Sequence, residues 1–199
     1  MARKLEHHEG RDAMTERENT LSWILGTAYG LGWRTWVVPM TLAAVLVVTS
    51  LSNFLLFHTL AELFAITVGT IMAVVAWNTY TFSRNHFLMF LGCGYFWIAG
   101  LDLIHAFAYK GMNLLESGGA NLAVQYWLAA RFSEVLLLLT APFFLIRPVS
   151  RKRTFALFGA IAAALCLAIV TGLFPTGFVD GVGLTPFKVY SEYLIILLL

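Results

Sequence analysis

Charged residues are scarce in this sequence of 199 residues. Asp, Glu, Lys and Arg make up 12% of the chain and apolar residues 59%, whereas about 25% of the residues in a typical soluble domain are charged. The mean hydropathy is +0.78. The few charges are clustered, and long stretches between them carry almost none. This composition excludes an ordinary soluble protein and predicts an integral membrane protein.

The sequence also lacks the alternation of apolar and polar residues that a membrane β-barrel requires. Because a helix satisfies its own backbone hydrogen bonds in lipid, the expected fold class is all-α, a polytopic helical membrane bundle. Only two cysteines are present, Cys93 and Cys166, and both lie in apolar runs. We interpret them as small buried residues rather than as a disulfide or a metal site.

A membrane-spanning helix needs about 20 apolar residues. Residues 1–34 form a polar N-terminal tail, in which the short, Gly-rich stretch 21–33 is expected to lie on the membrane as an interfacial helix. Residues 35–199 are expected to form the transmembrane domain, with spans at 36–57, 58–80, 86–108, 122–146, 154–174 and 189–199. The sixth span is still apolar at Leu199, so we expect the chain to be a fragment of a longer protein.

Lys and Arg residues are concentrated in alternate flanking segments. One set of segments contains Arg3, Lys4, Arg11, Arg17, Arg34, Arg84, Arg147, Arg151, Lys152 and Arg153. The opposite loops, 109–121 and 175–188, contain only Lys110 and Lys188. Basic residues mark the cytoplasmic side of a membrane protein. We therefore expect a cytoplasmic N-terminus and outward-facing loops at 109–121 and 175–188.

Three predicted spans each contain a pair of ionisable residues spaced three or four positions apart. That spacing places each pair on one helical face, and the pairs are His58 with Glu62, Asp102 with His105, and Arg131 with Glu134. Because the spans alternate in direction, all six side chains fall in the outward-facing half of the membrane. Their common depth predicts one polar cluster, the candidate signal-sensing site, to which we add Lys110 and Glu192 from the outer ends of neighbouring segments.

Three other polar or aromatic residues are expected to have structural roles. Trp77 is expected to anchor the second span near the cytoplasmic face, and Asn78 to bond to a neighbouring span. Trp127 precedes Arg131 by four residues, so its ring is expected to lie beside the guanidinium. Small residues permit close helix packing, and those on the relevant faces are Gly69, Ala73, Ala76, Gly92, Gly94 and Gly100.

Three interpretations of the polar cluster remain open. The first is a structural charge network, in which Arg131 pairs with Asp102 or Glu134. The second is a site that binds a small ligand or senses a proton. The third is a metal or haem site, because histidine and carboxylate ligands bind zinc, iron or manganese, two neutral histidines can hold a haem, and the chain offers His58, Glu62, Asp102 and His105. The chain has no HExxH motif.

Four blocks of the sequence resemble, in order, the third family of bacterial membrane-associated sensor domains, the MASE group. They are FHTLAELFAITVGTIMAVVAWNTY, GLDLIHAFAYKGMN, QYWLAARFSEVLLLL and GVGLTPFKVYSEY. Positions that match the family pattern are His58, Glu62, Trp77, Asn78, Asp102, His105, Lys110, Gly111, Trp127, Arg131, Glu134 and the GLTPFK loop. The resemblance implies an input module in the bacterial inner membrane, followed by a cytoplasmic histidine kinase or diguanylate cyclase domain.

A sensory input domain without enzymatic activity of its own is therefore the leading functional hypothesis. We also expect a homodimer and no nucleic-acid partner. One alternative is a membrane enzyme or redox protein that uses a metal or a haem at the same cluster. A proton or ion transporter is a second alternative. The second is disfavoured because the sequence shows no related halves and because the charges are expected on one side only.

Overall fold

The computed structural model describes residues 34–112 and 119–199 of the chain. The chain divides into two compact units, with the division between Ser52 and Asn53. Helix α2 (Arg34–Ser52) belongs to the first unit and is apolar along most of its length. The second unit contains the other helices and two short strands, and it holds the whole candidate site.

Asparagine residues cap the N-termini of the first two helices of the second unit. The Asn53 Oδ1 atom accepts a hydrogen bond from the Leu56 N–H at 3.1 Å, as expected for an N-cap. Helix α3 (Phe54–Ser83) therefore begins at Phe54, and not at His58 as the apolar pattern indicated. Asn85 caps α4 (His86–Ala108) in the same way, accepting the Leu88 N–H at 2.9 Å. The bounds of α4 are those expected for the third span.

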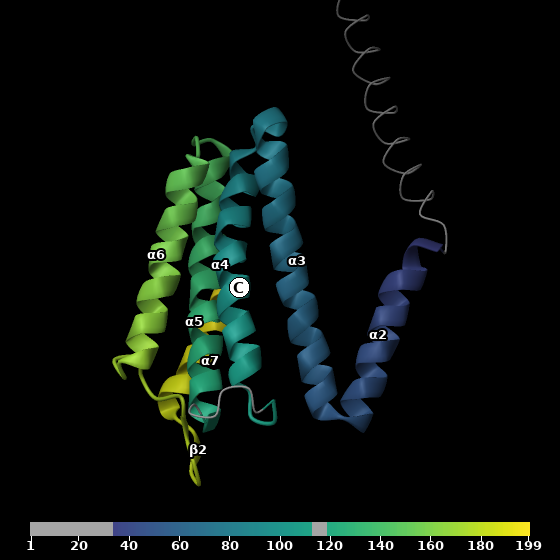
Figure 1. Ribbon diagram of the computed structural model, residues 1–199, viewed down its shortest axis with the longest axis vertical. Coiled ribbons are helices and arrows are strands. Elements are labelled where there is room, and N and C mark those ends of the chain that lie inside the picture. Colours follow the sequence, from purple (N-terminus) through teal and green to yellow (C-terminus); the bar gives the residue numbers. More distant parts are fainter. Residues whose placement is uncertain (1–33, 113–118) are drawn as a thin grey trace, which may run out of the picture. The chain divides into compact units, whose positions relative to one another are not determined.

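Helix α4 is the central helix of the second unit. It packs against α3, α5 (Gly119–Thr140), the 3-10 turn η1 (Ala141–Leu145) and α6 (Arg151–Val170). Figure 1 shows α4 and α5 between α3 on one side and α6 on the other. About half of the residues in α4 are buried, whereas α3 buries only Gly69, Ala73, Ala76 and Tyr80. The outer helices leave apolar side chains exposed, as lipid contact requires.

A short hairpin and helix α7 complete the second unit. Strands β1 (Phe178–Val179) and β2 (Gly183–Leu184) pair antiparallel. The Asn121 Oδ1 atom accepts the N–H groups of Gly177 and Phe178 at 2.8 and 3.0 Å, which attaches this hairpin to the start of α5. Helix α7 (Pro186–Leu198) then packs against α5. The hairpin and its attachment thus fix where α7 enters the unit.

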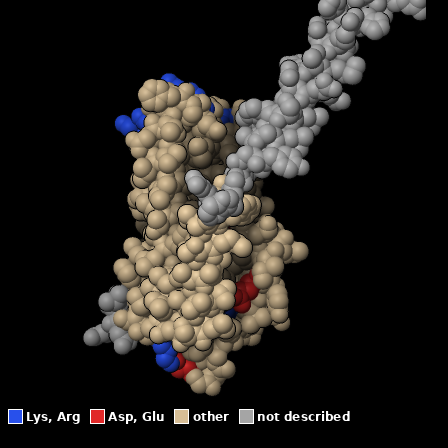
Figure 2. Space-filling view, turned by 90° about the vertical axis from the view of Figure 1, so that its right-hand side faces the viewer, with Lys and Arg blue, Asp and Glu red and all other residues tan. Residues whose placement is uncertain are grey.

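Five described helical segments are long and apolar enough to cross a membrane: α2, α3, α4, α5 with η1, and α6. The described part of α7 has 13 residues, fewer than the roughly 17 that a span needs. The expected all-α membrane bundle is confirmed. Exposed basic side chains gather at the end where α3 ends and α6 begins, shown at the top of Figure 2, and include Arg84, Arg147, Lys152 and Arg153.

Small residues allow α3 and α4 to approach closely. A Cβ atom added to Gly92 of α4 would lie 2.6 Å from the Cβ of Ala76 and 3.3 Å from the Cα of Ala73, both on α3. The expected close packing is therefore found at Gly92. Gly100 has a different environment, because a Cβ atom there would meet no heavy atom within 4 Å.

The substitution Gly92→Ala is expected to destabilise the bundle by about 1–3 kcal/mol, because neither Ala76 nor the α3 backbone can move aside without repacking. The measurement is the thermal unfolding midpoint of the detergent-purified chain, followed by tryptophan fluorescence. Gly100→Ala is the matched control and should leave the midpoint unchanged or raise it, since alanine favours a helix. Equal effects of the two substitutions would contradict the packing described.

Candidate functional site

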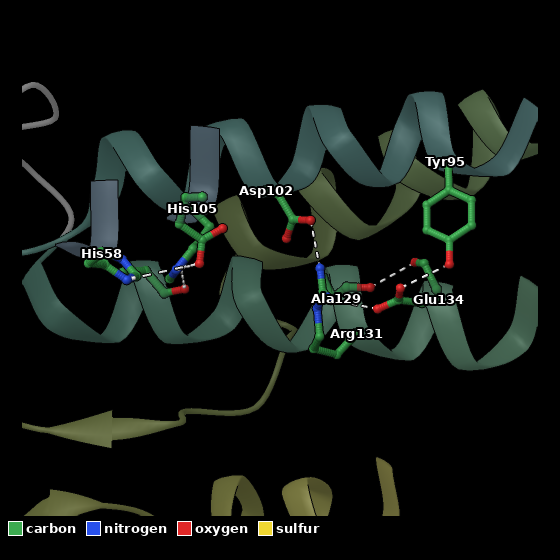
Figure 3. A network of polar contacts seen from close by, with 10 residues as sticks. His58, Tyr95, Asp102, His105, Ala129, Arg131 and Glu134 are labelled. Atoms are coloured by element: carbon green, nitrogen blue, oxygen red, sulfur yellow. Dashed lines mark hydrogen bonds and ion pairs between the residues drawn. The ribbon is translucent and has the colours of Figure 1, made fainter. Parts of the chain in front are cut away.

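Two groups of polar residues line the region where α3, α4 and α5 meet (Figure 3). The histidine group consists of His58 and Glu62 of α3 and His105 of α4. The arginine group consists of Tyr95 and Asp102 of α4 and Arg131 and Glu134 of α5. From Tyr95 to His105 the two groups extend along about 15 Å of α4, at about 1.5 Å per residue.

Arg131 is the centre of the arginine group. Its Nη2 atom donates to Asp102 Oδ2 at 2.6 Å, and its Nη1 atom donates to Glu134 Oε2 at 2.5 Å. The Tyr95 hydroxyl donates to the other Glu134 oxygen at 3.1 Å. Arg131 thus pairs with both carboxylates that the sequence offered as alternatives, and it joins α4 to α5. One guanidinium faces two carboxylates.

The arginine group retains unused hydrogen-bonding capacity. Asp102 Oδ1 and Arg131 Nε are buried and have no hydrogen-bond partner among the described residues. Buried polar atoms are normally bonded. Both residues line a cavity of about 470 Å³, whose other walls include Val68, Gly69, Met72, Tyr95, Ile98 and Glu134. The arrangement can hold a molecule with an apolar body and a polar head.

In the histidine group, the orientation of His105 is fixed by the backbone. Its Nδ1 atom lies 2.8 Å from the carbonyl oxygen of Ala123 on α5. Because a carbonyl oxygen only accepts, Nδ1 carries a hydrogen, and in the neutral imidazole Nε2 carries the lone pair. The Nε2 atom lies 3.6 Å from Glu62 Oε1, and the same oxygen lies 4.0 Å from His58 Nδ1. One oxygen therefore faces both imidazoles.

Aromatic rings hold His58 in place. The Phe54 ring is nearly parallel to the imidazole, with centroids 6.2 Å apart, and the Tyr109 ring lies closer, at 3.9 Å. The His58 and His105 rings meet edge to face at 5.4 Å. The Nε2 atoms of both histidines are buried and have no hydrogen-bond partner among the described residues.

The remaining members of the predicted cluster lie elsewhere. Lys110 is exposed in the turn after α4. Glu192 Oε1 forms an ion pair with Lys188 Nζ at 2.5 Å within α7. The Lys188 Nζ atom also lies 3.8 Å from the centre of the Trp127 ring. The cation over the Trp127 ring is thus Lys188, which the hairpin brings there, while the carboxylates of Asp102 and Glu134 hold Arg131.

Trp77 and Asn78 lie near the other end of α3, away from both polar groups. The Trp77 ring contacts Phe155, with centroids 5.7 Å apart, and the Arg151 guanidinium lies 5.3 Å from its centre. The Asn78 side chain donates to the Val74 carbonyl of its own helix at 2.8 Å. The expected bond from Asn78 to a neighbouring span was wrong, because a backbone carbonyl one turn earlier is within its reach.

Two residues that contact the polar groups, and one buried lysine outside them, were not identified from the sequence. Tyr95 precedes Asp102 by seven residues, which places both on one helical face, and this spacing is a signal that could have identified it. Tyr109 covers His58 from the end of α4. Lys188 is buried only because the hairpin folds back onto α5, and its position in the sequence carries no sign of that.

A model of the MASE3 family, described as a membrane-associated sensor domain, matches residues 49–199, which include both polar groups. The chain belongs to this family. The resemblance inferred from the four sequence blocks is therefore confirmed, and so is a multi-pass membrane sensor domain. The family is defined as a sensor rather than as a catalytic domain. Searches of curated proteins and of solved structures found no match.

Replacement of Arg131 by Gln is expected to destabilise the chain by about 3–5 kcal/mol, because it leaves the buried carboxylates of Asp102 and Glu134 without a cation. The triple variant Arg131→Gln, Asp102→Asn, Glu134→Gln removes all three charges together. It should lose clearly less stability than the single variant, since contacting residues are coupled by about 0.5–3 kcal/mol. Unfolding midpoints in detergent measure both, and an equal or larger loss in the triple variant would contradict the network.

Proposed function

We propose that this chain is the sensory input domain of a larger protein in the bacterial inner membrane. In this proposal a signal acts at the arginine and histidine groups and shifts the bundle between two packings. The single observation that carries the proposal is the set of unbonded buried atoms, Asp102 Oδ1 and Arg131 Nε, at the wall of a cavity between three helices. Membership of a family of membrane-associated sensor domains supports it.

The arginine group has the properties that a switch requires. Asp102 and Glu134 lie on different helices and compete for one guanidinium. A ligand that accepts a hydrogen bond from Arg131, or that replaces one carboxylate, interacts differently with packings in which α4 and α5 lie closer or farther apart. Such differential binding is what moves a conformational equilibrium. Tyr95 extends the group toward the middle of α4.

The distribution of basic residues supports the orientation of the domain. Arg84, Arg147, Lys152 and Arg153 are exposed at the end of the second unit opposite to the histidine group. Under the positive-inside rule that end is cytoplasmic. In this orientation the histidine group lies near the outer surface, and the signal arrives from outside or from within the membrane.

The output of the protein is proposed from the family resemblance. A cytoplasmic histidine kinase or diguanylate cyclase domain in the same chain would receive the change in packing, and the protein would act as a homodimer. Helix α7 is the connecting element in this proposal. It packs against α5, the helix that carries Arg131, through Ile195 with Leu128 and Val135.

Replacement of Asp102 by Asn in the full-length protein should change the basal output by about 5-fold or more, the usual range of an allosteric coupling. The amide keeps the shape of the side chain and removes the charge that holds Arg131. The measurement is kinase autophosphorylation or cyclic dinucleotide synthesis in membranes that contain equal amounts of folded protein.

Asp180→Asn is the matched control, because it makes the same chemical change in the exposed turn between β1 and β2. It should leave the output at the level of the unmodified protein. An Asp102→Asn protein whose output is also unchanged would remove the arginine group from the proposed switch.

A further inference from the structure

We propose that His58, Glu62 and His105 bind a divalent first-row transition-metal ion, and that Zn²⁺ is the ion that best fits these ligands. The binding itself is a property of the histidine group alone. Its use as a signal, or as a support for the signalling state, rests on the proposed function.

The three side chains already converge on one point. One ring nitrogen from each histidine and one carboxylate oxygen of Glu62 all lie within 4.8 Å of one another. In a tetrahedral zinc site with bonds of about 2.0–2.1 Å, neighbouring ligand atoms are about 3.3 Å apart. The distance from His105 Nε2 to Glu62 Oε1 is 3.6 Å. His58 Nδ1 lies 4.0 Å from the same oxygen, so closing the site requires side-chain rotations that bring the three ligand atoms nearer to one another.

His105 has the environment of a metal ligand. His105 is only 5% exposed. The Ala123 carbonyl fixes the tautomer of the neutral ring that has its lone pair on Nε2. Ligating histidines typically donate their other ring N–H to a carbonyl or a carboxylate in this way. The free lone pair faces Glu62 and has no hydrogen-bond partner among the described residues. Two acceptors that face each other repel unless a proton or a metal cation lies between them, and the buried pair of Glu62 and His105 offers its two lone pairs to either.

His58 completes the set from the other side. Its ring is held by Tyr109 and Phe54, and its own Nε2 is buried without a described partner. Glu62 lies one helical turn after His58, which directs both side chains to the same face of α3. The ligands thus come from two helices, and a bound ion would connect α3 to α4.

The charges of the region favour a divalent cation. The carboxylates of Glu62, Asp102 and Glu134 lie near a single guanidinium, that of Arg131, which leaves a formal excess of two negative charges. Lys188, another cation of the unit, is paired with Glu192. An ion of charge +2 would balance the excess, and buried charges are stable only when they are compensated.

The ligand types define the class of metal. Two imidazoles and one carboxylate are suited to zinc and to iron, whereas magnesium and calcium prefer sites made only of oxygen. Asp102, the fourth residue of the metal set expected from the sequence, lies outside this group because its Oδ2 atom is bonded to Arg131. Three protein ligands leave one coordination position for water or for a signal molecule.

The test uses the chain in lipid nanodiscs, prepared with an affinity tag that contains no histidine and with His7→Ala and His8→Ala in every sample. Metal is removed with a chelator, and Zn²⁺ is then titrated against a chromophoric competitor. We expect one tightly bound ion per chain. Glu62→Gln and His105→Ala should each weaken binding by about 100-fold or more, beyond the effect of losing a supporting residue.

Glu192→Gln is the matched control, because it makes the same change as Glu62→Gln at a carboxylate outside the group. It should bind Zn²⁺ as the unmodified chain does. Addition of Co²⁺ should give the visible absorption of a tetrahedral site in the control and not in Glu62→Gln. A chain that binds no stoichiometric Zn²⁺, or a Glu62→Gln variant that binds it equally well, would overturn the proposal.

The outcomes separate this proposal from the sensory function. If no metal binds but Asp102→Asn still changes the output of the full-length protein, only the metal site is wrong. If Zn²⁺ binds as expected but Asp102→Asn has no effect on the output, the metal site stands and the proposed switch is wrong.

Discussion

The ion pair between Asp102 and Arg131 is the interaction on which the arrangement of α4 and α5 depends. Both charges lie where water is scarce, so neither can separate from the other without a large desolvation cost. Glu134 adds a second carboxylate from α5 itself. Among the described residues, α3 has no arginine–carboxylate pair to α4, although its Tyr80 hydroxyl lies 2.8 Å from His86 Nδ1 of α4. It is held to α4 by the close approach at Gly92 and by the histidine group. The bundle therefore has one pair of helices joined by a buried ion pair, α4 with α5, and one pair joined mainly by close packing, α3 with α4.

That difference gives the two polar groups different roles. The arginine group fixes α4 against α5, while Glu62 and His105 form a contact between α3 and α4 that lacks a good hydrogen bond in the described unit. An added cation or ligand at the histidine group would strengthen the weaker contact. A ligand at the arginine group would instead compete with the stronger contact, that of Arg131 with its carboxylates. A ligand would therefore have opposite effects on helix packing at the two groups. Both groups lie within about three turns of α4, at about 1.5 Å per residue.

The sequence predicted the helical membrane bundle because long apolar runs and scarce charge leave few alternatives. It also predicted the six ionisable residues of the site, since pairs spaced three or four apart share a face and alternate spans bring them to one depth. It did not predict their division into two groups. That division depends on which oxygen Arg131 reaches and on the Ala123 carbonyl that orients His105. Neither contact can be predicted from the spacing of residues in the sequence. The burial of Lys188 was equally unpredictable, because Asn121 and the hairpin determine it.

Helix α4 provides a direct connection between the two groups. Asp102 and His105 are one turn apart on the same face, and one binds Arg131 while the other faces Glu62. A rotation or shift of α4 that improves one contact therefore moves the other side chain with it, because a helix behaves as a rigid element over a single turn. In the proposed function, a signal at the histidine group would consequently reach Arg131 without a chain of intermediate residues. From Arg131, α5 leads to Leu128 and Val135, which pack against Ile195 of α7. The path from the proposed metal ligands to the last helix thus uses only two rigid helices and the contacts between them.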